Sequence, residues 1–113
     1  MTIINMEQLS SFFEQWDSVK ESIETYYAKR DKEAVVLMNE AIYAYMNLLQ
    51  TGGTEKNQRT GECEYILLPL NGDERIDFIK KRIASHYSYI QLDALFLESK
   101  KKAARYSVMK RKS

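Results

Sequence analysis

Apolar side chains near the start of this chain recur at the spacing of one face of an α-helix. Between Leu9 and Tyr27 they return every three or four residues and fall on one side of a helical wheel. We therefore expect a helix whose inner face builds much of the core, with Trp16 at its centre. The expected inner face consists of Leu9, Phe12, Phe13, Trp16, Val19, Ile23, Tyr26 and Tyr27. The opposite side is acidic (Glu7, Glu14, Asp17, Glu21 and Glu24), which predicts a solvated face.

A second helical pattern follows a short polar link. Asp31 is a good N-cap and predicts a helix from that residue to about Gln50. The link at 28–30 is so short that the two helices should form an antiparallel hairpin. The expected core stripe of this second helix is Val35, Met38, Ile42, Tyr45, Met46 and Leu49.

The middle of the chain predicts irregular structure. Residues 51–61 have neither periodicity nor apolar content, so we expect a mobile surface loop at about 51–62. Residues 63–70 are mostly apolar and include the only proline, Pro69. Because the sequence shows no second strand-like run to pair with them, we expect an extended crossover that lies against the helices.

Two further helices are predicted after this crossover. Asn71 as N-cap, with Glu74 in the capping-box position, predicts a third helix whose inner face is Ile76, Ile79 and Ile83. A last helix, starting near Ser85, has apolar residues on two nearly opposite faces. One face comprises Tyr89, Leu92, Leu95, Phe96, Ala103 and Tyr106, and the other comprises Tyr87, Ile90, Ala94 and Leu97.

Two apolar faces on one helix require two surfaces to pack against. Either the last helix lies centrally, between the helical hairpin and the 63–70 segment, or its second face contacts a partner, such as a second copy of the chain. Both alternatives fit an all-α, four-helix bundle-like single domain at residues 1–106, followed by a flexible basic tail at 107–113. A length of 113 residues supports one hydrophobic core but not two.

The sequence offers few residues for catalysis. Cys63 and His86 are the only cysteine and histidine, so neither a zinc-type spacing nor a Glu-x-x-His pair for a di-iron site can be built. We expect Cys63 to be packed in its apolar run, and His86 to hydrogen-bond Asp93. A Cys63–His86 dyad would need the fold to bring the two together. We therefore predict no catalytic residue, no metal and no cofactor, and we favour a non-enzymatic role over an enzymatic one.

Other features bear on the cellular compartment. A single cysteine allows no intrachain disulfide and fits a reducing compartment. The N-terminus lacks the positive start and apolar run of a signal peptide, and no apolar stretch of 18 residues occurs. We expect a cytoplasmic protein that does not enter the membrane.

Charge is distributed unevenly along the chain. Residues 100–113 hold seven Lys and Arg and no acid, whereas the other ninety-nine residues hold ten basic and sixteen acidic side chains. Such a basic end attracts acidic surfaces. We therefore predict an acidic partner, nucleic acid first and protein second. Tyr87, Tyr89 and Tyr106 lie among the cations and could stack on bases. The candidate partner-binding residues are Arg75, Lys80, Lys81, Arg82, Lys100, Lys101, Lys102, Arg105, Lys110, Arg111 and Lys112.

The alternative function is that of a homodimeric or protein-binding helical scaffold. Its contact surface would be the second face of the last helix, formed by Tyr87, Ile90, Ala94 and Leu97.

The second half of the chain carries motifs of a known family. They are an E-R-x-x-F-I segment at 74–79, an H-Y-x-x-x-Q-L segment at 86–92 and a Leu-Phe ending with lysines at 95–101. In these motifs the chain resembles the YpoC-like family of small helical proteins from Gram-positive bacteria. The resemblance implies a cytoplasmic bacterial protein without an assigned activity, and the polar stretch at 51–61 departs from it. The matching motif positions are Arg75, Phe78, His86, Tyr87, Gln91 and Leu92.

Overall fold

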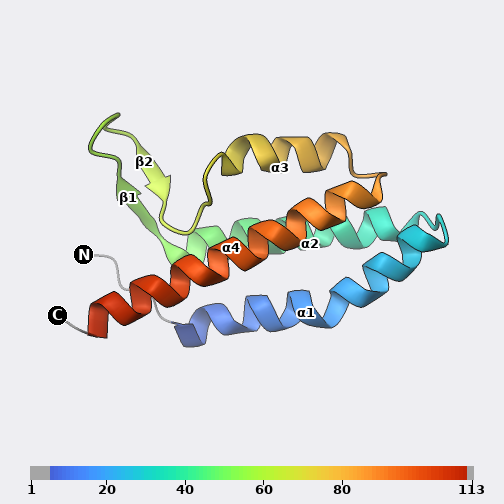
Figure 1. The fold of residues 1–113 in the computed structure, drawn as a ribbon, viewed down its shortest axis with the longest axis horizontal. Coiled ribbons are helices and arrows are strands. Elements are labelled where there is room, and N and C mark those ends of the chain that lie inside the picture. Colours follow the sequence, from blue (N-terminus) through green and yellow to red (C-terminus); the bar gives the residue numbers. More distant parts are fainter. Residues whose placement is uncertain (1–5, 112–113) are drawn as a thin grey trace.

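Four α-helices and one short β-hairpin make up the part of the chain that the structure describes. This computed structural model describes the backbone of residues 6–111 and the side chains of residues 6–107. Its elements are α1 (Met6–Ala28), α2 (Glu33–Gly52), β1 (Thr54–Lys56), β2 (Cys63–Tyr65), α3 (Gly72–Lys81) and α4 (His86–Arg111) (Figure 1). The predicted all-α fold with four helices is confirmed.

α1 and α2 form the antiparallel hairpin expected from the short link between them. Arg30 adopts a positive φ of 55°, and the backbone N–H of Asp31 donates to the carbonyl of Tyr26 at 2.9 Å, which closes the turn. The carboxylate of Asp31 accepts a hydrogen bond from the backbone N–H of Glu33 at 2.9 Å. Asp31 therefore satisfies an N–H at the start of α2, although the helix begins two residues later than predicted.

Trp16 lies at the centre of the core, as predicted. Its side chain is 4% exposed, and its ring stacks on Phe96 of α4 with centroids 4.7 Å apart. The indole N–H donates to the carboxylate of Asp93 at 2.8 Å, so the one polar atom of this buried ring is satisfied. Around it lie the buried residues of the predicted stripes on α1 and α2, which are Leu9, Phe13, Ile23, Met38, Ile42, Tyr45 and Leu49.

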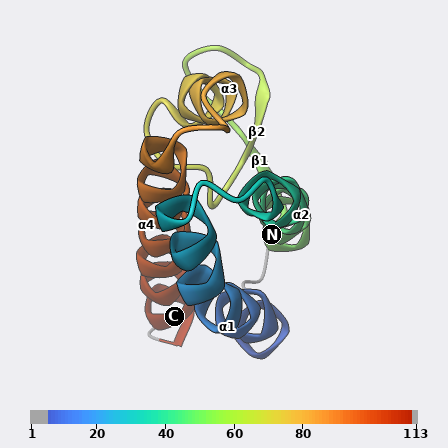
Figure 2. The same cartoon turned by 90° about the vertical axis from the view of Figure 1, so that its right-hand side faces the viewer.

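α4 is the helix that joins the two sides of the molecule. It packs against α1 on one side and α3 on the other, and it also contacts α2. Figure 2 shows the molecule along its long axis, with α3 on the far side from α1. The predicted inner face of α4 is confirmed, since Tyr89, Leu92, Leu95, Phe96 and Ala103 are buried and Tyr106 is half-buried.

Residues 54–65 form a β-hairpin, which the sequence did not predict. β1 pairs antiparallel with β2, with Glu55 opposite Glu64. The expectation of a surface loop throughout 51–62 is therefore wrong for residues 51–52 and 54–56. α2 extends to Gly52, and residues 54–56 supply the second strand that the sequence pattern did not reveal. The turn is closed by Asn57, whose side-chain oxygen accepts a hydrogen bond from the backbone N–H of Arg59 at 2.8 Å.

Of the extended crossover expected at 63–70, residues 63–65 instead form β2, and residues 66–70 lie against the helices as expected. The hydroxyl of Ser99 donates to the carbonyl of Leu67 at 2.8 Å, and the hydroxyl of Tyr45 bonds to Ser99 at 2.7 Å. All three residues are fully buried. Close packing continues at Gly52, where a Cβ atom would lie only 2.5 Å from a methyl carbon of Leu67. This buried chain of hydrogen bonds joins α2, α4 and the crossover.

The structure differs from expectation at the start of α3 and at the end of α4. Asn71 precedes α3 but makes no side-chain cap, because its backbone is left-handed (φ 58°) rather than in the extended conformation from which an N-cap side chain reaches the first turn. The predicted capping box is therefore wrong. The expected boundary at 106/107 falls inside α4, whose backbone continues to Arg111.

Candidate polyanion-binding surface

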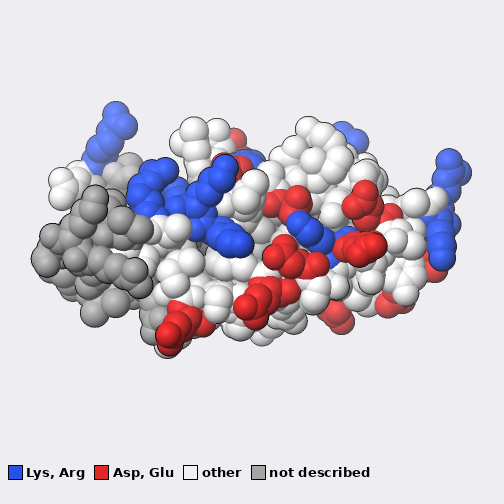
Figure 3. Space-filling model, turned by 60° about the horizontal axis from the view of Figure 1, so that its bottom comes forward, with Lys and Arg blue, Asp and Glu red and all other residues white. Residues whose placement is uncertain are grey.

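The C-terminal half of α4 presents a cationic face. Lys100, Lys101 and Arg105 are exposed, whereas Ser99 and Ala103, on the other side of the helix, are buried. Lys101 and Arg105 make no ion pair with any residue that the structure describes. In Figure 3, cations gather over this half of α4 and anions spread over α1. These three side chains are available to an anionic partner.

Two of the predicted cations hold the fold together instead. The guanidinium of Arg75 donates to both carboxylate oxygens of Glu98, at 3.0 and 2.6 Å. This hydrogen bonding raises the pKa of Arg75 and lowers that of Glu98. The ammonium of Lys102 donates to the carbonyl of Leu68 at 3.0 Å and is half-buried. Arg75 fixes α3 to α4, and Lys102 fixes the crossover to α4.

The Lys80–Arg82 group lies at the other end of α4. α3 runs antiparallel to α4, so its last turn lies beside the first turn of α4 (Figure 1). Lys81 pairs with Asp77 at 2.9 Å, and the guanidinium carbon of Arg82 lies 5.9 Å from the ring centroid of Phe78. A single chain therefore divides the predicted cations into two groups, one at each end of α4.

Three predicted cations lie at the end of the chain. The backbone of Lys110 and Arg111 belongs to α4, which places both on the same helix as Lys100. Their side chains, and all of Lys112, lie outside the described residues.

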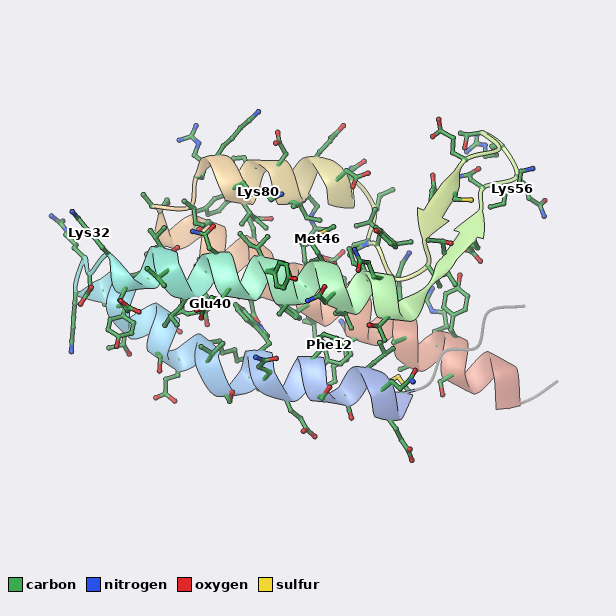
Figure 4. The ribbon with its side chains drawn as sticks, turned by 180° about the vertical axis from the view of Figure 1, so that it is seen from behind. Phe12, Lys32, Glu40, Met46, Lys56 and Lys80 are labelled. Carbon is green, nitrogen blue, oxygen red and sulfur yellow. The ribbon has the colours of Figure 1, made fainter. Side chains whose placement is uncertain are left out.

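The fold adds cations that the sequence analysis did not single out. Lys29, Arg30 and Lys32 are exposed in the α1–α2 turn. Figure 4 places Lys32 at the end of the molecule where α3 finishes, and Lys56 in the β-hairpin at the opposite end. The sequence feature that could have indicated this cationic group is the Lys-Arg-Asp-Lys run at 29–32. Its place beside the end of α3 depends on tertiary structure.

The second apolar face of α4 is uncovered. Tyr87, Ile90 and Leu97 are 51%, 47% and 52% exposed, and Ala94 is half-buried. α4 does lie between the helical hairpin and the crossover, as the first alternative expected. The expectation that this position covers its second apolar face is wrong, because α1, α2 and α3 pack on the other sides of α4. Tyr87 makes an edge contact with Phe78 of α3, with ring centroids 5.7 Å apart. Contact of this face with a partner stays a prediction.

Cys63 and His86 lie far apart. β2 is at one end of the molecule and the first turn of α4 is at the other (Figure 1). Cys63 is exposed, so the expectation that it is packed is wrong. His86 stacks on Tyr89 with centroids 5.5 Å apart. Asp93, its expected partner, instead accepts the hydrogen bond of Trp16. This arrangement forms no Cys–His dyad.

Three of the expected family-motif positions, Arg75, Phe78 and Tyr87, lie at the contact between α3 and α4. Arg75 bonds Glu98, and the ring of Phe78 meets that of Tyr87. Leu92 is 1% exposed, and Gln91 is half-buried. His86 is exposed, and its ring contacts Tyr89 of α4 and Tyr27 of α1.

A cavity of ≈ 70 Å³ lies between α1, α2 and α4, and Figure 4 shows Phe12 of its lining pointing from α1 toward α2. Within residues 6–111, no cluster of three or more His, Cys, Asp or Glu side chains could hold a metal ion. None of the described helices is both long and apolar enough to cross a bilayer.

Comparison with known proteins identifies relatives but no activity. The family model described as YpoC-like protein matches residues 6–111. The "Uncharacterized protein YpoC" of Bacillus subtilis (strain 168) is 31% identical over 107 residues, which cover 88% of this chain and 64% of that protein. The chain therefore spans slightly less than two thirds of the length of this relative. No solved structure matches the chain.

Proposed function

The chain belongs to the YpoC-like family, and we propose that it is a non-enzymatic protein that binds the phosphate backbone of nucleic acid. The binding surface is the cationic face on the C-terminal half of α4. The observation that carries the proposal is that Lys100, Lys101 and Arg105 share this exposed face, while Lys102 and Arg75 make internal contacts. The bound partner is held by charge.

Helix geometry favours an extended anionic partner. Lys101 and Arg105 are four residues apart, so they lie about one helical turn, or ~6 Å, from each other along α4. Lys110 and Arg111 continue the same helix. A row of cations along a rigid rod suits a backbone with regularly spaced phosphates, because successive contacts release condensed counterions. A compact monovalent anion would use only one or two of them.

The surface favours binding without base recognition. Of the tyrosines expected to stack on bases, Tyr89 is buried and Tyr106 donates its hydroxyl to Glu55 at 3.3 Å. Tyr87 is exposed but lies at the opposite end of α4 from the cationic face. The side chains that remain are cations, which position a duplex on its phosphates without reading its sequence. We propose the cytoplasm as the compartment, since the exposed thiol of Cys63 suits a reducing environment.

The test is a salt-dependent titration with a matched control. The chain is titrated with fluorescent duplex DNA, single-stranded DNA and RNA at several salt concentrations. Replacing Lys100, Lys101 and Arg105 with Gln should weaken binding to every sequence alike. It should also reduce the log–log salt slope by about 2–3, since each lost phosphate contact contributes about 0.9. The control replaces Lys29, Arg30 and Lys32 with Gln, which removes the same charge from the other end of the molecule.

The two triple variants give separate outcomes. The control should keep the slope of the parent, because within one chain the α1–α2 turn lies at the opposite end of the molecule from the proposed surface (Figure 1). Equal losses in both variants would show that net charge, and not the α4 face, drives binding. Absence of binding to all three nucleic acids at low salt would refute the proposal and leave an acidic protein surface as the partner.

A further inference from the structure

α4 leaves one strip of its surface uncovered between α1 and α3. On one side, α4 contacts α1 at two places: Asp93 accepts a hydrogen bond from the indole of Trp16, and the ammonium of Lys100 lies over the ring of Phe13. On the other side, Glu98 contacts α3 through its ion pair. Between these contacts runs a line of residues at helical spacing, which we call the α4 strip. It comprises Tyr87, Ile90, Ala94, Leu97, Lys101 and Ala104.

We propose that the α4 strip binds the same strip of a second copy of this chain, with the two α4 helices antiparallel. A two-fold axis between positions 95 and 96 places Leu97 opposite Ala94 of the second copy. The same axis places Tyr87 opposite Ala104 of the second copy. In both cases a large, half-exposed side chain faces a small one, which is the arrangement that lets ridges of one helix enter grooves of another.

The last pair of residues in the strip, Ile90 and Lys101, can also pack against each other only when the two helices are antiparallel. Ile90 comes opposite Lys101 of the second copy. The methylene stem of that lysine can cover the isoleucine while its ammonium stays in water. Parallel pairing would instead place Lys101 against Lys101, and like charges at an apolar contact are unfavourable. The strip therefore selects an isologous, two-fold contact, which closes at two copies.

Charges on the α1 side of the strip are complementary in the same arrangement. Lys100 of one copy comes opposite position 91 of the other. There it is flanked by Asp93, which already lies 3.7 Å from Lys20 of its own chain, and by Glu24, which accepts a hydrogen bond from Tyr89 at 3.3 Å. Figure 3 shows anions along α1, with one group of cations over the C-terminal half of α4 and another at the opposite end of the molecule. Reversing a second copy sets Lys100 of each chain toward the anions along α1 of the other.

The pairing would reunite the two groups of cations that one chain separates. The C-terminal half of one α4 comes beside the last turn of α3 in the second copy. Arg105 of one chain then lies near Lys80–Arg82 of the other. These cations repel each other unless an anion lies across them, so a polyanion should strengthen the dimer. This step rests on the proposed function, whereas the pairing itself rests on the α4 strip.

The first experiment measures mass against concentration for the full chain. Sedimentation equilibrium should show a monomer–dimer equilibrium for the parent. Ile90→Glu should weaken the dimer by about 30-fold or more, because it buries a charge at the centre of a contact. The matched control is Val36→Glu, since Val36 is 48% exposed on α2 and Ile90 is 47% exposed on α4. The control should leave the dimer unchanged, and circular dichroism checks that both variants are folded.

The second experiment tests direction by cross-linking and does not depend on weakening the contact. In a Cys63→Ser background, Ile90→Cys alone should form no disulfide-linked dimer, because the two copies of position 90 lie ~16 Å apart along antiparallel helices. Mixing this variant with Lys101→Cys should give a cross-linked heterodimer. Rapid cross-linking of Ile90→Cys to itself would indicate parallel helices and overturn the proposal.

The outcomes keep this inference separate from the proposed function. A chain that stays monomeric at all concentrations, or dimers that Ile90→Glu and Val36→Glu affect equally, would overturn the pairing. Neither result bears on whether the chain binds a polyanion. A dimer that cross-links as predicted but binds no duplex DNA supports the pairing and refutes only the composite cationic sites.

Discussion

The buried hydrogen-bond chain through Ser99 makes a prediction that can be worked out atom by atom. Ser99 has one hydroxyl proton, and it is donated to the carbonyl of Leu67. The 2.7 Å contact with Tyr45 must therefore use the phenolic proton, with the serine oxygen as acceptor. Ser99→Ala leaves two buried groups without a partner, the Tyr45 hydroxyl and the Leu67 carbonyl. At about 1–3 kcal/mol for each orphaned group, the cost should be about 2–6 kcal/mol.

Tyr45→Phe should cost less, although it also removes one buried hydroxyl group. Ser99 keeps its bond to Leu67 and loses only one donor, so the expected cost is about 0.5–1.5 kcal/mol. The double variant leaves only the Leu67 carbonyl unpaired, for about 1–3 kcal/mol. The double variant should therefore be less destabilised than the sum of the single variants, and no worse than Ser99→Ala alone.

Urea denaturation of the four proteins measures these differences. The slope of the free energy of unfolding against urea should be the same for all four, which shows that the variants change stability and not the compactness of either state. Strict additivity of the two substitutions would contradict the assigned direction of the hydrogen bonds. A larger cost for Tyr45→Phe than for Ser99→Ala would refute the reasoning as well.

The remaining predictions concern single sites. Trp16→Ala should destabilise the fold by about 3–5 kcal/mol, and a melting temperature within a degree or two of the parent would contradict its central place. Burial raises the pKa of Tyr45 to about 12. The stability that this contributes is therefore complete below pH 10 and lost as the pH rises from 10 to 12, and Tyr45→Phe should flatten alkaline unfolding. Gly52→Ala should cost about 1–3 kcal/mol by crowding Leu67, measured by urea denaturation. Cys63 should react with a dilute alkylating agent in the folded protein as fast as a free thiol, since it is exposed, and slow reaction limited by unfolding would show that it is covered.

Local patterns predicted the helices because each carries its own signal. The stripe around Trp16 and the inner face of α4 repeat at helical spacing within one segment, so no knowledge of neighbours is needed. The β-hairpin was missed for the opposite reason. All three residues of β1 are exposed and polar, so Thr54–Lys56 shows no alternation of apolar and polar residues. Its strand pairing comes from backbone hydrogen bonds across the turn.

The candidate site was predicted only in part because its residues meet through the fold. Periodicity showed that α4 has two apolar faces, but which face is covered depends on where α1, α2 and α3 pack. In the same way, the sequence around Arg75 indicates a free cation. In the folded chain its partner is Glu98, which is 23 positions away and lies at a distance of 2.6 Å. Asp93 is taken by Trp16, 77 positions away. Such pairings leave no trace in local spacing, and they decide which cations remain available.

Hydrogen bonds from the C-terminal half of α4 to the β-hairpin and to the crossover make the order of these segments depend on the order of that half of α4. Ser99 and Lys102 hold the crossover, and Tyr106 reaches Glu55 in β1. These donors lie on the same turns of α4 as the exposed cations. Any ligand that orders these turns should therefore slow amide hydrogen exchange in the hairpin, which it does not touch. Thermodynamic linkage makes the effect mutual, so loosening the hairpin should lower affinity at the basic face by the same factor.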